Sequence, residues 1–544
     1  MKGFVVLTLA VLLTLSVKAQ NYYWIGFTDK NGIEYSLSSP EDYLSQRAIQ
    51  RRDKQGIPID SLDLPVNRVY IDSILKTADV ELVHASKWLN GITVKSRINL
   101  EEIQFPELSF VREVQLTKPN LITKSAHSKF EKETISDITP IDTSVYGSSV
   151  NQVGMLEGQF LHNNGYRGEG LQIAVLDAGF YKADEFAAFD SLWAGYQILG
   201  TYDFVDPESD IYTEHYHGMS VLSTMGGNIP GQLIGTAPHA KYWLLRSEDA
   251  ATEYMIEEDN WAAAAEFADS VGVDIINSSL GYYEFDDSAM NHTYGDMDGH
   301  TTRVTQAANI AASKGILVFA SAGNERNDPW FRIIAPSDGD KVIGVGAVDK
   351  DLYPASFTSA GPASDGEIKP NVSAMGVRAT AQLASGSIGP ISGTSFSSPI
   401  LAGMTACLWQ RYPDKTAVEI KVALQKSGNQ YFSPDSLLGY GIPNMSTASA
   451  ILDPLAAELH ERNDSWRVYP NPMTDRLTIQ ASSLGQGKVK LHLITMDGTV
   501  LKAWEKPIKK QIQLTDLPGL SAGIYYLKIE TGSFSETVKL RKIK

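Results

Sequence analysis

Four short stretches of this 544-residue chain carry side chains that suit acyl-transfer chemistry. Ser395 follows Gly393 and Thr394 and precedes a long apolar run, a pattern typical of a loop that turns into a helix. At a helix start, the helix dipole and free backbone N–H groups lie beside the serine hydroxyl. These features suit a nucleophile whose attack creates an oxyanion. Taken alone, the stretch also fits an ordinary capped helix.

Three further polar residues stand at comparable places in the chain. Asp177 ends an apolar predicted strand, His217 precedes Gly218 at a predicted helix start, and Asn324 follows another strand. Each of them alone also fits a structural role, because aspartate and asparagine are common in turns. We interpret His215, which lacks the glycine-to-helix context, as a surface or packing residue. The order Asp, His, Asn and Ser on an α/β background is one of the three chain orders in which a Ser-His-Asp triad occurs.

The elements that must position these residues are alternating strands and helices between residues 150 and 452. Buried-looking strands are predicted at 171–176, 240–245, 273–276, 316–320 and 342–345, with helices such as 261–271 and 305–314 between them. This alternation predicts a three-layer, doubly wound, mostly parallel sheet with helices on both faces. In such folds, function collects at the carboxyl ends of the strands.

The combined motifs resemble those of the subtilisin-like serine proteases (subtilases, peptidase family S8). The resemblance is carried by residues 175–179 (VLDAG), 217–219 (HGM), 321–324 (SAGN) and 393–395 (GTS), and also by 235–238 (GTAP), 275–281 (IINSSLG) and 369–372 (KPNV). It covers roughly residues 150 to 450. Two departures stand out: Ala178 replaces a more usual Thr or Ser, and bulky Phe396 follows the serine, where it is expected to reshape the nearby wall.

The resemblance implies a role for each matching residue. Ser395 would attack the scissile carbonyl, His217 would act as general base and then acid, and Asp177 would orient and stabilise the imidazolium. The Asn324 side chain and the Ser395 backbone N–H would form the oxyanion hole. The segment Ser279, Leu280 and Gly281 would line the primary specificity pocket and pair with substrate as an added strand.

No cofactor is expected to be required, and no metal ligands are assigned. Calcium sites are frequent in subtilases, and the loop 284–300 bears Asp286, Asp287, Asp296 and Asp298. Because no clear ligand-spacing motif is present there, a merely solvated acidic loop is the preferred interpretation.

The regions outside the central one predict a multidomain precursor. Residues 1–19 are typical of a secretory signal peptide. Residues 20–120 predict a ferredoxin-like α+β module, with one helix starting at Ser39-Pro40 and another at 100–103. Residues 121–149 form a predicted linker with a processing site. After a second linker at 453–466, residues 467–544 predict a β-sandwich with a hairpin turn at Asp497-Gly498.

The resemblance gives both flanking domains an expected role. The first resembles the inhibitory and folding-assisting propeptide of subtilases; a separate binding domain is the alternative. The last resembles a type A C-terminal sorting domain of the type IX secretion system of certain Gram-negative bacteria, and a carbohydrate- or cell-binding sandwich is its alternative. That similarity rests on residues 469–472 (YPNP), 493–498 (LITMDG) and 520–528 (LSAGIYYLK).

Charge and hydropathy restrict the partners. The net charge of −17 disfavours nucleic acid or an anionic membrane as the main partner. The single cysteine, Cys407, excludes an internal disulfide, and no membrane-spanning segment is found beyond the N-terminal run. The expected partners are protein or peptide substrates, the chain's own propeptide and the type IX machinery.

The sequence therefore predicts a secreted or surface-attached serine endopeptidase, made as a self-processed zymogen and acting through an acyl-enzyme intermediate. The alternative is a catalytically silent subtilase-like surface protein that binds other proteins. A third possibility is a protease that chiefly processes itself or other exported precursors.

Overall fold

The computed structural model describes residues 20–101, 108–120, 129–130, 145–453, 466–471, 473, 475–481, 487–495, 499–531 and 534–542. The chain divides into two compact units, Met1–Leu452 and Asp453–Lys544. The predicted signal peptide, residues 102 and 103 of the helix predicted at 100–103 and the predicted turn at Asp497-Gly498 lie outside the described residues.

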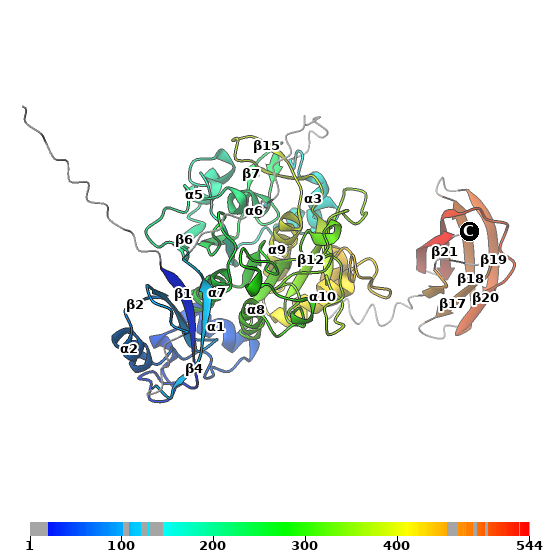
Figure 1. The fold of residues 1–544 in the computed structure, drawn as a ribbon. Helices are drawn as coiled ribbons and strands as arrows, with labels where there is room; N and C mark the ends of the chain where they lie inside the picture. The colour runs from blue at the N-terminus through cyan, green and yellow to red at the C-terminus, as the bar shows by residue number, and fades with distance from the viewer. Residues whose placement is uncertain are drawn as a thin grey trace, which may run out of the picture. The chain divides into compact units, whose positions relative to one another are not determined.

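A seven-stranded parallel sheet forms the centre of the first unit (Figure 1). Its order is β13-β12-β11-β10-β5-β9-β6, and every neighbouring pair is parallel. The strands are β5 (Gln172–Asp177), β6 (Ile198–Asp203), β9 (Lys241–Arg246), β10 (Ile275–Ser278), β11 (Leu317–Ser321), β12 (Ile343–Val348) and β13 (Val372–Met375). The central strands are buried along nearly their whole length, as a sheet covered on both faces requires.

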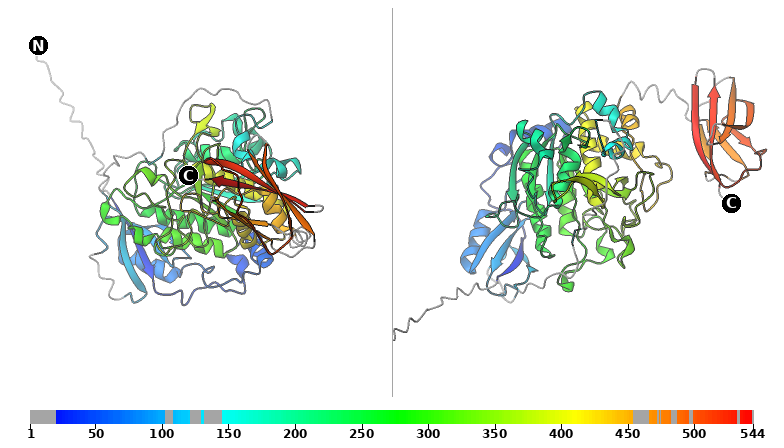
Figure 2. Two further views of the ribbon diagram at one scale, coloured as in Figure 1. Left: turned by 90° about the vertical axis from the view of Figure 1, so that its right-hand side faces the viewer. Right: turned by 90° about the horizontal axis from the view of Figure 1, so that it is seen from above.

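Helices cover both faces of this sheet (Figure 2). One apolar core joins Ile173 and Val175 of β5 to α6 (His217–Gly226) and α9 (Thr394–Arg411). A second core joins Ala174 and Leu176 of the same strand to α7 (Ile256–Val271) and α8 (Arg303–Ser313). Since successive residues of a strand point to opposite faces, β5 contributes to both cores. The predicted doubly wound fold is confirmed.

Smaller elements complete this part of the chain. They are α3 (Val150–Gly154), α4 (Gly158–Asn163), α5 (Asp190–Ala194), α10 (Ala417–Ser427), α11 (Met445–Leu452), the strand pairs β7 (Asn228–Ile229) with β8 (Leu233–Ile234) and β14 (Ala379–Gln382) with β15 (Ile388–Ile391), and the 3-10 helices η2 (Ala187–Phe189), η3 (Ser288–Met290), η4 (Tyr294–Asp296) and η5 (Glu325–Asn327). Among the described residues, no helix combines the length and apolarity needed to cross a bilayer.

The N-terminal domain is an antiparallel sheet in the order β2-β3-β1-β4, with two α-helices in its described ranges 20–101 and 108–120. Its elements are β1 (Asn21–Phe27), α1 (Gln46–Gln55), α2 (Arg68–Thr77), β2 (Val80–Ser86), β3 (Gly91–Ser96) and β4 (Val111–Lys118). The helix start predicted at Ser39 is wrong. Residues Pro40–Asp42 form a single 3-10 turn, η1, and the α-helix begins only after Ser45, whose hydroxyl accepts the Ala48 N–H.

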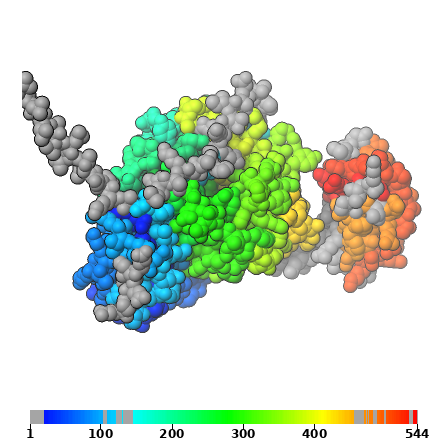
Figure 3. Space-filling model, in the orientation of Figure 1, coloured from blue at the N-terminus to red at the C-terminus, as the bar shows by residue number. Residues whose placement is uncertain are grey.

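This domain packs against α7 and also contacts Arg303 of α8, and Figure 3 shows it in blue beside the green central part of the chain. Buried charges lie in this interface. Asp269 of α7 is fully buried and accepts hydrogen bonds from Arg51, Arg52 and Lys87, at 2.5, 2.9 and 3.1 Å. All three cations belong to the N-terminal domain. The interface is therefore fixed by a charge network as well as by apolar contact.

The second unit is a β-sandwich of two antiparallel sheets around its own apolar core. One sheet has the order β16-β17-β20 and the other β19-β18-β21-β22. The strands are β16 (Trp466–Tyr469), β17 (Leu477–Ala481), β18 (Lys488–Thr495), β19 (Val500–Pro507), β20 (Gln511–Leu514), β21 (Gly523–Thr531) and β22 (Phe534–Lys542). The predicted sandwich is confirmed, with β16 and β19 in addition to the strands that the sequence indicated.

Candidate active site

Asp177 and His217 form a buried hydrogen-bonded pair where β5 ends and α6 begins. His217 Nδ1 lies 2.8 Å from Asp177 Oδ1, and both side chains are almost wholly removed from solvent. A Cβ at position 218 would lie 2.5 Å from the Gly179 carbonyl oxygen, so only glycine lets α6 start this close to the strand. With Nδ1–H donating to the carboxylate, Nε2 is the nitrogen that remains to accept a proton.

The other carboxylate oxygen of Asp177 is less well satisfied. In the described part of the chain, no donor reaches the buried Oδ2 atom. The next residue is Ala178, whose methyl group cannot donate a hydrogen bond, while its backbone N–H binds Oδ1 at 2.8 Å. Ala178, which stands where the motif more usually has Thr or Ser, is therefore directly next to this carboxylate.

Ser395 is the second residue of α9, where the sequence predicted a helix start. Gly393 precedes the helix with a φ of 144°, a conformation that favours glycine. Pro399 has no N–H to give to the Ser395 carbonyl, and the Ser279 hydroxyl donates to that oxygen instead, at 2.8 Å. The Ser395 hydroxyl in turn donates to the Ser279 carbonyl oxygen at 3.3 Å. Two hydrogen bonds thus hold the start of α9 against the segment that follows β10.

The Asn324 amide has a fixed orientation. Its Oδ1 atom accepts the Thr394 backbone N–H and the Thr394 hydroxyl, both at 2.9 Å. A backbone N–H only donates, so the oxygen must face Thr394, and the amide NH2 group is left as a donor on the other side. Thr394 is itself fully buried and accepts the Gly323 N–H at 3.3 Å.

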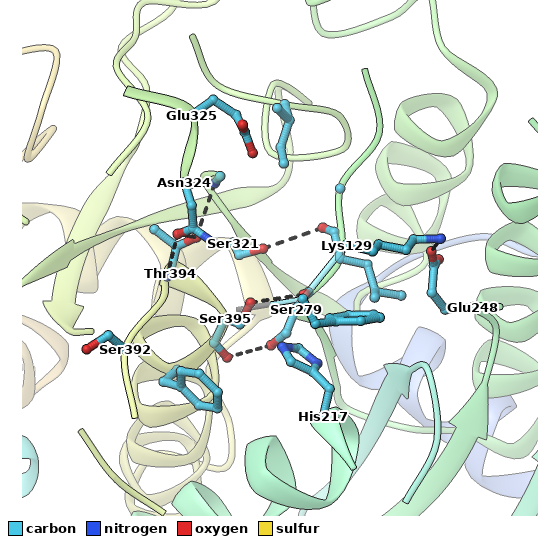
Figure 4. Close-up of a pocket in the computed structure, with 16 residues that line it drawn as sticks. Lys129, His217, Glu248, Ser279, Ser321, Asn324, Glu325, Ser392, Thr394 and Ser395 are labelled. Carbon is cyan, nitrogen blue, oxygen red and sulfur yellow. Dashed lines mark hydrogen bonds and ion pairs between the residues drawn. The ribbon is translucent and has the colours of Figure 1, made fainter. Parts of the chain in front are cut away.

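All of the predicted site residues except Asp177 line one pocket (Figure 4). Its lining includes His217, Asn324, Ser395, Phe396 and the segment 279–281. Asp177 does not line the pocket and lies behind the imidazole. The Phe396 ring, 2 % exposed, lies 5.7 Å from the His217 ring between centroids, so this bulky residue forms part of the wall. The arrangement combines a hydroxyl, an oriented imidazole and an amide donor, which suits acyl transfer.

Two residues of the predicted linker also lie in this pocket, and sequence reasoning missed them. Lys129 and Phe130 are among its lining residues. The Phe130 ring lies 4.5 Å from the His217 ring and 4.6 Å from the His215 ring, between centroids. The pocket therefore already contains a piece of the chain's own polypeptide.

His215 contacts the site, although the sequence predicted only a surface or packing role for it. Its Nδ1 atom accepts the His217 backbone N–H at 3.3 Å. Burial, followed by the charges of His217 and Lys129, lowers the pKa of His215 to about 4. The ring is therefore neutral at neutral pH, as an accepting Nδ1 requires.

Three further carboxylates, Glu248, Glu253 and Glu257, were also missed. Their oxygens lie within 4.8 Å of one another, and the Lys129 ammonium group is paired with all three. The residues are spread over ten positions, from the loop after β9 to the first turn of α7, so no local spacing pattern indicates them. In contrast, Asp286, Asp287, Asp296 and Asp298 of the loop 284–300 accept hydrogen bonds from nearby backbone N–H groups.

Comparisons with known proteins identify the families of the three parts of the chain. The family model of the subtilase family matches residues 168–441, half of the chain. The model of the peptidase S8 propeptide domain of Bacteroidota matches residues 22–133, which include Lys129 and Phe130. The model of a secretion system C-terminal sorting domain matches residues 467–543.

Curated relatives give the same result. Subtilisin E of Bacillus subtilis (strain 168) is 28% identical over 304 residues, covering 55% of this chain and 70% of that protein. Serine protease AprX of the same strain is 28% identical over 340 residues, covering 57% and 70%. A thermostable alkaline protease of Halalkalibacterium halodurans is 27% identical over 350 residues, covering 64% of this chain and 84% of that protein.

Among solved structures, MycP1 from Mycobacterium smegmatis matches with a TM-score of 0.43 at 19% identity, covering 55% of this chain and 84% of that one.

The chain thus belongs to the subtilase family: it is a subtilisin-like serine protease with an S8 propeptide domain and a type IX sorting domain. The sorting domain implies export and a secreted or surface-attached location. The predicted family and enzyme class are confirmed, while the predicted domain boundaries and the role of each site residue stay predictions.

Proposed function

We propose that the protein is an endopeptidase that cleaves peptide bonds with Ser395, His217 and Asp177 through an acyl-enzyme intermediate. The observation that carries the proposal is the buried Asp177–His217 pair, 2.8 Å between Oδ1 and Nδ1, beside the pocket that also holds Ser395. Ser395 Oγ attacks the scissile carbonyl while His217 Nε2 takes its proton. His217 then returns the proton to the leaving amine, and water releases the acyl group by the same steps.

The negative charge that develops on the substrate oxygen needs donors that are already in place. The Asn324 NH2 group and the Ser395 backbone N–H are proposed to supply them. Ser395 lies in the first turn of α9, where backbone N–H groups have no acceptor within the helix. The segment 279–281, which lines the same pocket, is proposed to bind the substrate backbone and its primary side chain.

The chemistry proposed needs no cofactor, because nucleophile, base and oxyanion donors all come from the chain. A bound calcium ion would contribute to stability only. The loop 284–300 gives this idea little support, since its four aspartates bind nearby backbone groups.

We further propose that the precursor is latent. The Phe130 ring covers the His217 imidazole, and the Ser395 hydroxyl is hydrogen-bonded to the Ser279 carbonyl. Removal of the N-terminal domain together with this segment would open the pocket to substrate. Its own propeptide is then both a folding partner and the first inhibitor of the enzyme.

The test compares hydrolysis of a casein and of quenched fluorescent peptides by matured wild-type protein and by Ser395→Ala. Wild type is expected to cleave both, whereas Ser395→Ala should retain less than about one part in 10⁴ of kcat while still folding. Equal rates in both proteins would contradict the proposed role of Ser395. A folded, matured wild type that cleaves neither substrate would instead support the silent binding protein.

A further inference from the structure

The pocket of the candidate catalytic residues is also lined by Glu248, which forms a three-glutamate cluster with Glu253 and Glu257. Glu248 follows β9, Glu257 lies in the first turn of α7, and Glu253 belongs to the loop between them. The side chains of Glu248 and Glu257 are 1% exposed, and that of Glu253 is 15% exposed. Three carboxylates this close and this buried repel one another unless a cation lies between them.

The cation in the structure is a side chain of the chain itself. The Lys129 Nζ atom lies 2.8 Å from Glu253 and 2.7 Å from Glu257, and it also pairs with Glu248. It donates further to the Thr252 carbonyl oxygen at 2.9 Å. The cluster therefore surrounds the Lys129 ammonium group with hydrogen-bond acceptors, an arrangement that a surface patch of acidic side chains does not have.

The charges in the cluster depend on this occupant. Burial raises the pKa of Glu253 to about 8 and that of Glu257 well above its ordinary value. Burial would lower the pKa of Lys129, but the three carboxylates outweigh it and raise that pKa well above its ordinary value. The Lys129 charge lowers the pKa of both Glu253 and Glu257, so a neutral side chain in the same place would raise these two values further and favour the protonated acids.

The position of the cluster connects it with catalysis. Lys129 and Glu248 line the same pocket as His217 and Ser395 (Figure 4). Phe130, the residue after Lys129, is the one whose ring lies over His217. A polypeptide that follows this path places one side chain at the imidazole and the preceding side chain among the glutamates.

We propose that Glu248, Glu253 and Glu257 form a specificity subsite that selects a Lys or Arg side chain of the substrate close to the scissile bond. The inference rests on the proposed function, because it assigns a substrate class to the same pocket. Lys129 occupies the subsite in the precursor, and a basic residue of the substrate takes its place once that segment has left. Hydrogen bonds to charged groups in a buried site discriminate by about 10- to 100-fold against a side chain that lacks the charge.

The experiment uses the matured protein, from which the N-terminal domain and the Lys129 segment have been removed, and quenched fluorescent peptides that differ at a single position. Lys, Arg, norleucine or Glu is placed in turn at each of the five residues before the cleaved bond. We expect one position at which Lys and Arg exceed norleucine about 10- to 100-fold in kcat/KM, with Glu slowest of all. Norleucine is the matched control because it keeps the aliphatic chain of lysine and lacks the ammonium group.

Two variants locate the preference in the protein. In Glu248→Gln and Glu257→Gln the ratio of kcat/KM for Lys to that for norleucine should fall at least fivefold. Glu169→Gln is the matched control. Glu169 lies just before β5, at the opposite end of that strand from Asp177, and its carboxylate pairs with His239. This variant should leave the ratio of kcat/KM for Lys to that for norleucine unchanged. Circular dichroism shows whether each variant folds, and the peptide series on wild type needs no variant at all.

Each outcome has a definite meaning. Hydrolysis without a preference for Lys or Arg at any position overturns the subsite and leaves the proposed function intact. A preference that calcium weakens in proportion to its concentration shows that the ion and the basic side chain compete for the same carboxylates, and it supports the subsite. If no peptide is cleaved by folded, matured wild type, both the proposed function and the subsite are wrong.

Discussion

The most informative perturbation of the precursor is Asp269→Asn, because a single carboxylate of α7 pairs with three cations of the N-terminal domain. Asp269 is fully buried, and Arg51, Arg52 and Lys87 all donate to it. In the separated catalytic domain this carboxylate has lost all three cations and returns to water. Asparagine keeps its shape and removes its charge, so the effect should fall on binding of the N-terminal domain.

The magnitude follows from the burial of the network. Removing one partner from a buried ion-pair network costs about 3–5 kcal/mol, because the remaining charges stay buried without compensation. At about 1.4 kcal/mol for each factor of ten, the affinity between the two domains should fall about 100- to 4,000-fold. Most of this change is expected in the dissociation rate.

The assay starts from Ser395→Ala precursor with a specific protease site inserted between residues 134 and 144. Cutting the linker after folding leaves both domains native, and the dissociation rate of a fluorescently labelled N-terminal domain is then measured. Asp351→Asn is the control, since this exposed residue pairs only with its neighbour Lys350 among the described residues. A change of less than threefold in Asp269→Asn would refute the claim that the network holds the domain in place.

Further predictions concern the oxyanion donor, its support and a partly buried histidine. Asn324→Leu should lower kcat about 100- to 1,000-fold with little change in KM, the range known from subtilisin for loss of this kind of donor; an unchanged kcat would contradict the role. Thr394→Val removes the hydroxyl that orients the Asn324 amide and should lower kcat about tenfold, whereas Thr394→Ser should restore it; equal effects of both variants would point to packing alone. His292 is partly buried, with its side chain 12% exposed. This burial lowers its pKa, but its contact with Glu258 at 2.5 Å raises the pKa above its ordinary value overall. The pairing of protonated His292 with Glu258 therefore stabilises the folded state fully below the ordinary histidine pKa, and this contribution to folding stability is lost as pH rises through the raised pKa. The melting temperature of Ser395→Ala should fall over that range, and the fall should be smaller in His292→Gln/Ser395→Ala.

Much of the fold could be predicted from the sequence, because the relevant signals are local and repeated. The strands around Asp177, Ser279 and Asn324 read as short apolar runs, and their alternation with helices indicates a parallel sheet. Chain order then predicts that these residues meet at the carboxyl ends of the strands. Position by position, the strands that were predicted agree with β5, β9, β10, β11 and β12 within a few residues.

The features that the sequence did not predict depend on tertiary contacts or on weak local signals. Helix α2 begins after Asn67, whose side chain accepts the Val69 N–H, and its short, mixed composition gives little periodicity. The proline signal at Pro40 produced only a 3-10 turn, because a better-capped helix follows at Ser45.

The three-glutamate cluster and its lysine could not be found in this way. Lys129 stands in a polar, non-periodic segment that reads as a linker, and its partners lie some 120 residues further along the chain. Only the packing of that segment into the pocket brings them together. The contact between Phe130 and His215 could not be predicted either, because no sequence motif connects the two residues and their rings stack only in the folded structure.

The proposed catalytic role of Ser395 is tested most directly by a fluorophosphonate probe, followed by peptide mapping of the labelled residue. After removal of the N-terminal domain, wild type should carry one adduct, on Ser395. Ser395→Ala should carry none, and His217→Ala should label at least about a hundredfold more slowly because it lacks the general base. An adduct on another serine, or no adduct on a folded catalytic domain with an open pocket, would contradict the assignment.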